Sequence, residues 1–278
     1  MCPRPLTQFN FRYRLQPTAQ FEARFSGIVR LFGTEGAARL RKAHVCVVGI
    51  GGVGSWAVEA LARSGIGEIT LVDLDDVCIS NVNRQLPALT GNFGKPKVEV
   101  LAERVLAINP DCKINPRQEF FLQSNAAAIL SLPYDYVVEA IDGPSLKSLL
   151  IALCCGRKIP VITSGAAGGR RDPTAIAVDD LTRASNDPLL RQVRKNLRRR
   201  HNFPRGEDPF GVEAVFSREL VVYPQVDGSV CGERGDETDL RIDCSTGFGT
   251  ASFVTGVFGM VAASRVVQDI VAAEVTRL

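Results

Sequence analysis

Apolar residues in the first third of the chain follow two different periods. Val45–Val48 is an uninterrupted apolar run that enters a glycine-rich stretch, as expected of a buried strand. Residues 57–62 place apolar side chains at helical spacing, and residues 68–73 return to a strand-like pattern. These segments predict a βαβ unit of about thirty residues, in which the helix starts near Ser55.

Further elements follow this unit. Gly94-Lys95-Pro96-Lys97 opens a predicted helix that runs to Ile108, and Tyr136–Ile141 is a third buried strand that ends at Asp142. We also predict a helix over 146–155, a strand over 159–163 and a loop over 165–169. Two further strands, over 175–178 and 219–223, are expected to extend the sheet.

These elements predict an α/β protein with a Rossmann-like nucleotide-binding fold, whose mostly parallel sheet is extended by additional C-terminal strands. The chain shows neither an internal repeat nor a linker, so we expect a single domain over residues 21–273 and an N-terminal arm over residues 1–20. Of its 278 residues, 45% are hydrophobic and 23% are charged, which suits one large core and excludes a disordered or fibrous protein.

The longest lipid-like stretch is Gly247–Ala263, which contains no charged residue. Its length is at the lower limit for crossing a bilayer, and its glycines and threonines leave it only mildly apolar. We interpret it as a buried helix that packs closely on the sheet. Since the N-terminus has no apolar signal region and the cysteines show no extracellular pattern, a cytoplasmic protein without membrane association is expected.

Gly49, Gly51 and Gly54 form a G-x-G-x-x-G sequence directly after the first predicted strand. In this context Gly49 permits a tight turn, Gly51 lets backbone amides approach a phosphate, and Gly54 lets the helix pack on the strand. Asp73 follows 19 positions after Gly54, at the spacing of a carboxylate that grips a ribose. The sequence therefore predicts nucleotide binding.

The residues after Asp73 separate two classes of nucleotide-binding protein. A nicotinamide dehydrogenase needs few cations beyond the glycine loop, whereas chemistry at the α-phosphate of ATP needs fixed positive charge. Arg84 and Lys97 can supply that charge, and Asp142 is a candidate to hold magnesium beside the triphosphate. Each residue alone is also explained as a surface cation or a helix cap, but the ordered set favours ATP.

Five sequence groups occur in a fixed order: G-I-G-G-V-G from Gly49, L-V-D-L-D from Leu71, N-x-x-R-Q from Asn81, G-K-P-K from Gly94 and A-I-D from Ala140. The set resembles the ubiquitin-activating-enzyme-like adenylyltransferases, whose bacterial members activate sulfur-carrier proteins for thiamine and molybdopterin synthesis. Narrower motifs at 187–189, 222–225 and 243–249 most resemble the tRNA threonylcarbamoyladenosine dehydratase branch. The resemblance runs from Arg24 to about Val267.

This resemblance implies an enzyme that uses ATP to adenylate the threonyl carboxylate of the modified adenosine in tRNA and then closes a ring with loss of water. Within the implied site, Arg84, Lys97 and Asp142 are catalytic, and Asp142 holds magnesium. A tRNA substrate and a homodimer are also implied. The implied ATP-binding residues are Gly49, Gly51, Gly52, Gly54, Asp73, Asn81, Arg84, Gln85, Lys97 and Asp142.

Relatives usually carry an N-terminal R-Y-x-R-Q pattern, whose arginine reaches into the partner subunit's site. The matching stretch here begins Arg24-Phe25-Ser26-Gly27, so glycine stands where that arginine is found. Arg24 and Arg30 are the candidates to replace it, and each is equally well explained as an ordinary helix-surface residue.

The eight cysteines form no C-x-x-C pair, although many carrier-activating relatives bind a structural zinc through two such pairs. We therefore expect no structural zinc, and activation of a sulfur-carrier C-terminus is the less favoured alternative. Cys154 and Cys155 are expected in a buried helix. Cys231 leaves a third alternative, a sulfur-relay module with a cysteine-desulfurase-system partner, although a non-catalytic loop cysteine is the simpler interpretation.

Residues 191–205 contain seven Lys or Arg and no acidic residue, although the whole chain has a net charge of only +3. The rest of the chain is therefore net acidic, and the positive charge is local. Arg191, Arg194, Lys195 and Arg198 fall on one helical face suited to following phosphates. Together with Arg199 and Arg200 they are the predicted tRNA-binding residues, and a solvated basic helix is the alternative.

Overall fold

The computed structural model describes residues 17–225, 227–232 and 248–273. The main sheet contains β1 (His44–Val48), β2 (Glu68–Val72), β3 (Lys113–Arg117), β4 (Tyr136–Glu139), β5 (Val161–Ser164), β6 (Ile176–Asp180) and β7 (Glu213–Ser217). The helices are α1 (Pro17–Lys42), α2 (Gly54–Arg63), α3 (Lys97–Ile108), α4 (Ala126–Ile129), α5 (Pro144–Gly156), α6 (Pro188–Arg200) and α7 (Ser252–Ala272). Short 3-10 helices are η1 (Ile79–Asn81), η2 (Pro173–Ala175) and η3 (Leu181–Arg183).

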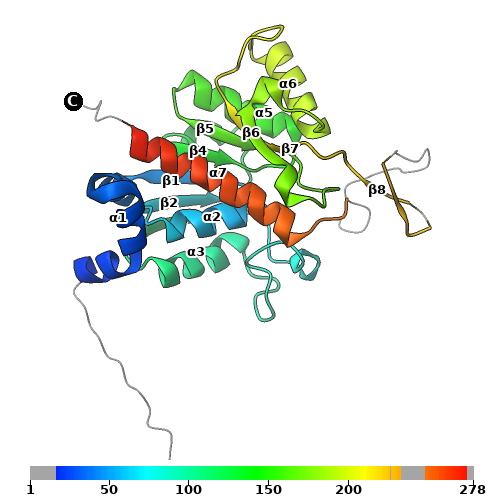
Figure 1. The fold of residues 1–278 in the computed structure, drawn as a ribbon. Coiled ribbons are helices and arrows are strands. Elements are labelled where there is room, and N and C mark those ends of the chain that lie inside the picture. The colour runs from blue at the N-terminus through cyan, green and yellow to red at the C-terminus, as the bar shows by residue number, and fades with distance from the viewer. Residues whose placement is uncertain (1–16, 226, 233–247, 274–278) are drawn as a thin grey trace, which may run out of the picture.

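The seven strands have the order β3-β2-β1-β4-β5-β7-β6. Neighbours from β3 to β7 are parallel, and β6 pairs antiparallel with β7. Helices pack on both faces of this sheet (Figure 1). The structure thus confirms the predicted Rossmann-like fold with a mostly parallel sheet that C-terminal strands extend.

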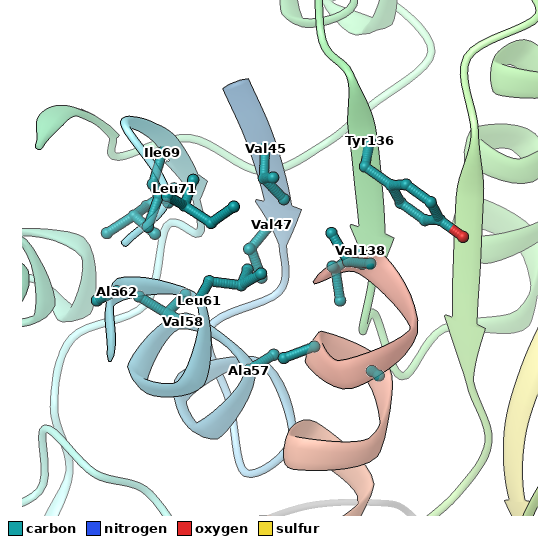
Figure 2. Packing of buried hydrophobic residues seen from close by; sticks show 14 of the residues in the cluster. Val45, Val47, Ala57, Val58, Leu61, Ala62, Ile69, Leu71, Tyr136 and Val138 are labelled. Carbon is teal, nitrogen blue, oxygen red and sulfur yellow. The ribbon is translucent and has the colours of Figure 1, made fainter. Parts of the chain in front are cut away.

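The sheet separates two hydrophobic layers. Val45 and Val47 of β1 belong to the layer formed with α2, α3 and α7, whereas Cys46 and Val48 belong to the layer formed with α5 and α6. Figure 2 shows the first layer, where Leu61 of α2 lies near these valines. Because both faces are covered, every residue of β1 is buried, and the sequence shows an uninterrupted apolar run instead of alternation.

Helix α7 packs so closely against α2 that Gly259 has no room for a side chain. A Cβ on Gly259 would lie 2.5 Å from the carbonyl oxygen of Val53 and 2.7 Å from the amide nitrogen of Ala57. This helix is long and apolar enough to cross a membrane, but 56% of its apolar window is buried inside the protein. Its packing supports the interpretation of the uncharged stretch as a core helix, which begins at Ser252; Gly247 lies outside the described residues.

The predicted strand over 219–223 is wrong. The strand beside β5 is Glu213–Ser217, whose buried centre fills that place in the sheet. Residues 219–222 instead cross the loop after β5, and the Val222 amide donates to the carbonyl of Gly169 over 3.0 Å. The chain then forms a small hairpin of β8 (Tyr223–Pro224) and β9 (Val230–Cys231). The strand predicted over 175–178 is confirmed as β6.

Two elements lack a clear sequence pattern. β3 has the sequence Lys-Ile-Asn-Pro-Arg and forms an edge of the sheet, where a proline is tolerated because it removes no inner hydrogen bond. Helix α1 is interrupted by non-helical dihedrals at Phe25 and at Gly33, which has a φ of +74°. Residues 1–16 of the expected arm lie outside the described residues, and α1 begins at Pro17.

Candidate active site

The loop between β1 and α2 requires glycine at two positions. Gly49 has a φ of +91°, and a Cβ there would lie 2.7 Å from the carbonyl oxygen of Ala140. A Cβ on Gly54 would lie 1.8 Å from the carbonyl oxygen of Gly49, so α2 begins in direct contact with the end of β1. At Gly51 the nearest atom to an added Cβ is Gln85 Nε2 at 3.9 Å, which leaves this side of the backbone open to a phosphate.

Asp73 directly follows β2 and reaches across to the glycine loop. Its Oδ2 accepts a hydrogen bond of 2.6 Å from the amide of Ile50, and its Oδ1 accepts one of 2.9 Å from the amide of Asp75. Burial raises the pKa of the Asp73 carboxyl above its usual value, against the lowering effect of the two amides and of Lys97. The side chain therefore ties the ends of β1 and β2 together at the position of a ribose-binding carboxylate.

Arg84 projects from a backbone that two helices hold. Trp56 of α2 donates from Nε1 to the carbonyl of Arg84 over 3.0 Å, and the Thr255 hydroxyl of α7 donates to the same oxygen over 3.4 Å. The guanidinium donates to the Ser80 carbonyl over 2.7 Å and to Asn83 Oδ1 over 3.0 Å. The Cγ of Arg84 would lie 3.5 Å from a Cβ on Gly52, so this half-buried side chain begins beside the glycine loop.

Asn81 and Gln85 are buried on the same segment. Asn81 Oδ1 accepts from the amide of Cys78 over 3.2 Å, which shapes the turn at η1. Gln85 Oε1 has no hydrogen-bond partner among the described residues, and an unmet buried acceptor costs about 1–3 kcal/mol. A ligand that donates a hydrogen bond here would remove this cost, so Gln85 fits a binding role.

Lys97 is the first residue of α3 and is 4% exposed. Its ammonium donates to Asp75 Oδ2 over 2.9 Å, and its amide donates to the Asp75 carbonyl over 3.0 Å. An ammonium has three donors, so this one pairing leaves capacity for phosphate oxygens. Asp75 therefore places Lys97 at the carboxyl edge of the sheet.

Asp142 lies in the exposed turn after β4, above a buried ion pair. Glu139 Oε2 pairs with the ammonium of Lys147 and accepts from the Thr163 hydroxyl over 2.5 Å, and both charged side chains are 0% exposed. Glu139 Oε1 accepts from the amide of Ile141 over 2.8 Å. Buried ion pairs often add little net stability because desolvation is costly. This pair fixes the turn that presents Asp142.

The sheet order brings the predicted nucleotide residues to one edge. β2, β1 and β4 are neighbours, so Asp73, the glycine loop and Asp142 follow three adjacent strands within about 10 Å. Ligands of open α/β sheets bind outside such carboxyl ends. The open amides with Arg84 and Lys97 form a cationic cradle that suits a triphosphate.

Asp142 is the predicted carboxylate for a metal ion at this edge of the sheet. Among the residues that the structure describes, no group of three His, Cys, Asp or Glu side chains could hold a metal. Mg²⁺ in nucleotide sites is held by one or two carboxylates together with phosphate oxygens. Asp142 therefore fits magnesium that arrives with a nucleotide, not a metal held by protein alone.

The basic side chains of helix α6 fall into two groups, one half-buried and one exposed. Arg194 donates from Nη1 to the carbonyls of Leu181 and Ala184 over 3.2 and 2.8 Å, and Arg198 donates to the carbonyls of Pro204 and Gly206 over 3.2 and 2.8 Å. These two arginines of the predicted face thus also hold loops in place. The others, Arg191, Lys195, Arg199 and Arg200, are exposed.

The cysteines are dispersed over the described residues. Burial raises the pKa of Cys46 and of Cys112 to about 12, so both thiols are inert. In α5, Cys154 is buried as expected, and Cys155 is half-buried. Cys231 is exposed in β9, and the Cys244 motif lies outside the described residues.

Several supporting residues could not be assigned from motifs. Asp75 holds Lys97, Trp56 and Thr255 hold the Arg84 carbonyl, and Glu139 pairs with Lys147. One signal was visible: a glutamate interrupts the apolar strand 136–141, and a lysine interrupts the apolar helix that follows. Charges inside two adjacent apolar segments indicate a buried pair.

Known proteins are similar to this chain over nearly its whole length. A family model described as the ThiF family matches residues 25–277. The tRNA threonylcarbamoyladenosine dehydratase of Haemophilus influenzae is 49% identical over 251 residues, which is 90% of this chain and 94% of that protein. The Escherichia coli protein of the same name is 47% identical over the same shares.

A solved structure is also similar to this chain over nearly its whole length. The Escherichia coli tRNA N6-threonylcarbamoyladenosine dehydratase in complex with ATP matches with a TM-score of 0.82 and 42% identity, and the match covers 93% of this chain and 98% of that one. The range matched by the family model, residues 25–277, spans the glycine loop and the basic helix.

Proposed function

The chain belongs to the ThiF family, and we propose that it catalyses the ATP-dependent dehydration of threonylcarbamoyladenosine in tRNA to a cyclic form. The observation that carries this proposal is the similarity to the dehydratases over almost the whole of both chains. The cationic cradle at the carboxyl edge of the sheet supports the proposal, because α-phosphate chemistry needs fixed positive charge.

In the first step an oxygen of the threonyl carboxylate attacks the α-phosphate of ATP. A bond forms between carboxylate oxygen and phosphorus, pyrophosphate leaves, and an acyl adenylate results. The glycine-loop amides and Asp73 hold the nucleotide, and Gln85 offers it a buried acceptor. Arg84 and Lys97 stabilise the negative charge that builds on the phosphates, because both cations are fixed before the substrate arrives.

In the second step a nucleophile in the side chain of the same modified base attacks the activated carbonyl. AMP leaves with one former carboxylate oxygen, the nucleophile loses a proton, and the net change is loss of one water. The acceptor is intramolecular, so proximity replaces an external nucleophile. The ring closure needs no cysteine of the protein.

Magnesium belongs to the same proposal. Asp142 would hold it with the triphosphate, where the ion offsets phosphate charge. The exposed carboxylate and its rigid turn support this role. We assign no second protein carboxylate to the ion.

Further expectations concern the assembly, the location and the protein partner of the enzyme. A homodimer is supported by exposed apolar side chains after β2, among them Ile79 at 70% and Leu89 at 57% exposure. In such a dimer Arg30 is the better candidate for a contributed arginine, because Arg24 already donates to the carbonyl of Ile108 in its own chain. A cytoplasmic enzyme fits a tRNA substrate, and Cys231 is the candidate contact for a cysteine-desulfurase-system protein.

One experiment separates this function from adenylation of a sulfur-carrier protein. The enzyme is incubated with ATP and either unmodified tRNA, threonylcarbamoylated tRNA or a carrier protein, and nucleosides and AMP are measured. We expect AMP and a nucleoside lighter by one water with threonylcarbamoylated tRNA only. AMP formation with the carrier protein and intact modified nucleoside would overturn the proposal.

A further inference from the structure

A cavity of about 320 Å³ opens beside the N-terminus of α6, and none of its lining residues belongs to the glycine loop. Asn186, Asp187, Arg191 and Arg194 form one side of it. The segment after β7 also lines the cavity, with Leu220, Val221 and Tyr223. Such a volume lies near the lower end of small-ligand sites, which span about 300–1,000 Å³.

Arg170 lies behind the wall of this cavity and is 2% exposed. Its Nη2 donates to the carbonyl of Asn186, a lining residue, while Nε and Nη1 have no hydrogen-bond partner among the described residues. Burial lowers the pKa of Arg170, and the nearest opposing charges are the carboxylates of Asp187 and Glu219. A buried guanidinium with two unmet donors is costly unless a ligand or water supplies acceptors.

The acidic group of the cavity is already engaged by backbone. Asp187 Oδ1 accepts from the amide of Leu190 over 2.9 Å, and Oδ2 accepts from the amide of Ala166 over 2.8 Å. Arg194 is half-buried, and burial together with the like charges of Arg198 and Arg191 lowers its pKa. Cations held close together in partly dehydrated surroundings favour an anion, and a phosphate can accept from arginines in bidentate fashion.

The lining from the segment after β7 suits a base. Tyr223 is half-buried and packs against Phe248 with ring centroids 5.4 Å apart, and Leu220 beside it is 70% exposed. Unpaired RNA bases stack on aromatic side chains, and nearby arginines take the phosphates. A cavity lined by an aromatic ring, aliphatic side chains and arginines therefore matches one nucleotide of single-stranded RNA.

The position suits a substrate that reaches the adenylation edge. Asp187 binds the amide of Ala166, two residues beyond the end of β5, and β5 lies two strands from β1. Two strand spacings are about 10 Å. A nucleotide held here can neighbour one whose modified base extends to the ATP edge.

Resting on the proposed function, we propose that this cavity binds a nucleotide of the tRNA substrate adjacent to the reacting adenosine. Tyr223 stacks on the base, and Arg191 and Arg194 bind the phosphate. The buried Arg170, which holds the carbonyl of Asn186, adds positive charge behind this part of the lining. The cavity thereby places the modified base toward the edge that holds ATP.

The test compares tRNA binding and turnover in paired variants. Tyr223→Ala and Arg191→Glu should each weaken tRNA binding about tenfold, and the reversal should flatten the logarithmic salt dependence by about one unit. Tyr223→Phe keeps the ring and should bind as the wild type does. Lys42→Glu makes the same charge change in an exposed residue at the end of α1 and should have no effect. The ATP-induced rise in melting temperature should persist in all four.

A crosslinking experiment tests the cavity assignment independently of the proposed reaction. A short single-stranded RNA with a photoreactive uridine should crosslink to residues 220–223. Inorganic phosphate and AMP are added in parallel samples to test whether small phosphates compete with the RNA for the cavity. Two results would overturn the cavity assignment and leave the dehydratase proposal intact. One is crosslinking elsewhere, and the other is that the variants keep wild-type tRNA affinity while the wild type converts tRNA. A melting shift by inorganic phosphate that Arg191→Glu abolishes, without RNA competition, would make it a small-anion site and overturn the RNA assignment. If the wild type binds RNA in this cavity yet never forms AMP with modified tRNA, the cavity stands and the dehydratase proposal fails.

Discussion

At the scale of single residues, the acidic side chains of the edge divide by what they already bind. Asp73 and Glu139 accept hydrogen bonds from backbone amides, and Asp75 pairs with Lys97. Asp142 is exposed and makes no hydrogen bond or ion pair within the described residues. Its charge is therefore free to act on a ligand, and its loss leaves the folded chain intact.

Asp142→Asn should accordingly reduce AMP formation without changing the melting temperature. Loss of one preorganised electrostatic contact at a developing charge costs about 3 kcal/mol, which is on the order of a hundredfold in kcat. Asp208→Asn is the matched control, because Asp208 is also exposed but lies far along the chain after α6. Normal turnover by the Asp142 variant would remove this residue from the site.

At the scale of elements, the β4–α5 turn depends on a charge pair under it. Lys147→Met leaves the buried Glu139 carboxylate without its cation and should lower the free energy of unfolding by about 3–5 kcal/mol. The double variant Glu139→Gln with Lys147→Met should recover most of that stability, because glutamine still accepts from Ile141 and carries no charge. Urea unfolding measures both.

A second double variant tests what the pair does for the site. Glu139→Leu with Lys147→Met is also uncharged, but it cannot accept from the Ile141 amide. We expect it to fold and to lose kcat relative to the glutamine double variant, with ATP still raising the melting temperature. Equal kcat in the two double variants would show that the pair serves stability alone.

Helix α6 shows that one basic face can serve two purposes. Arg194→Met removes donors from the partly buried carbonyls of Leu181 and Ala184 and should cost about 1–3 kcal/mol of stability. Lys195→Met, at an exposed neighbouring position, should change stability by less than about 0.5 kcal/mol. Thermal unfolding distinguishes the two, and equal melting temperatures would deny Arg194 its structural role.

These elements also show how far sequence can lead. The glycine loop, Asp73, Arg84, Lys97 and Asp142 are predictable because each belongs to a short motif whose spacing reflects local geometry. Glu139–Lys147 and the Arg170 cavity are not, because their partners come from other elements and depend on the sheet order. The misplaced strand over 219–223 has the same cause: its apolar residues cover the loop after β5 instead of joining the sheet.

At the scale of the whole molecule, sheet order decides which ligand fits. The adjacency of β2, β1 and β4 places Asp73, the glycine loop and Asp142 at one edge, and with Arg84 and Lys97 this set suits ATP chemistry, whereas NAD binding needs few cations. ATP with magnesium should therefore raise the melting temperature, since a ligand at a hundredfold excess over Kd adds about 2.7 kcal/mol to stability. NAD at the same concentration should give no shift, and a shift with NAD alone would favour a dehydrogenase.

In the proposed reaction the carboxylate of the modified base becomes an acyl adenylate before the ring closes. The direct measurement uses tRNA whose threonyl carboxylate carries heavy oxygen, followed by mass spectrometry of the AMP. We predict one heavy oxygen in the phosphate of each AMP, together with a cyclic nucleoside that has lost one. AMP without label, formed while the nucleoside is dehydrated, would contradict adenylation of the substrate carboxylate.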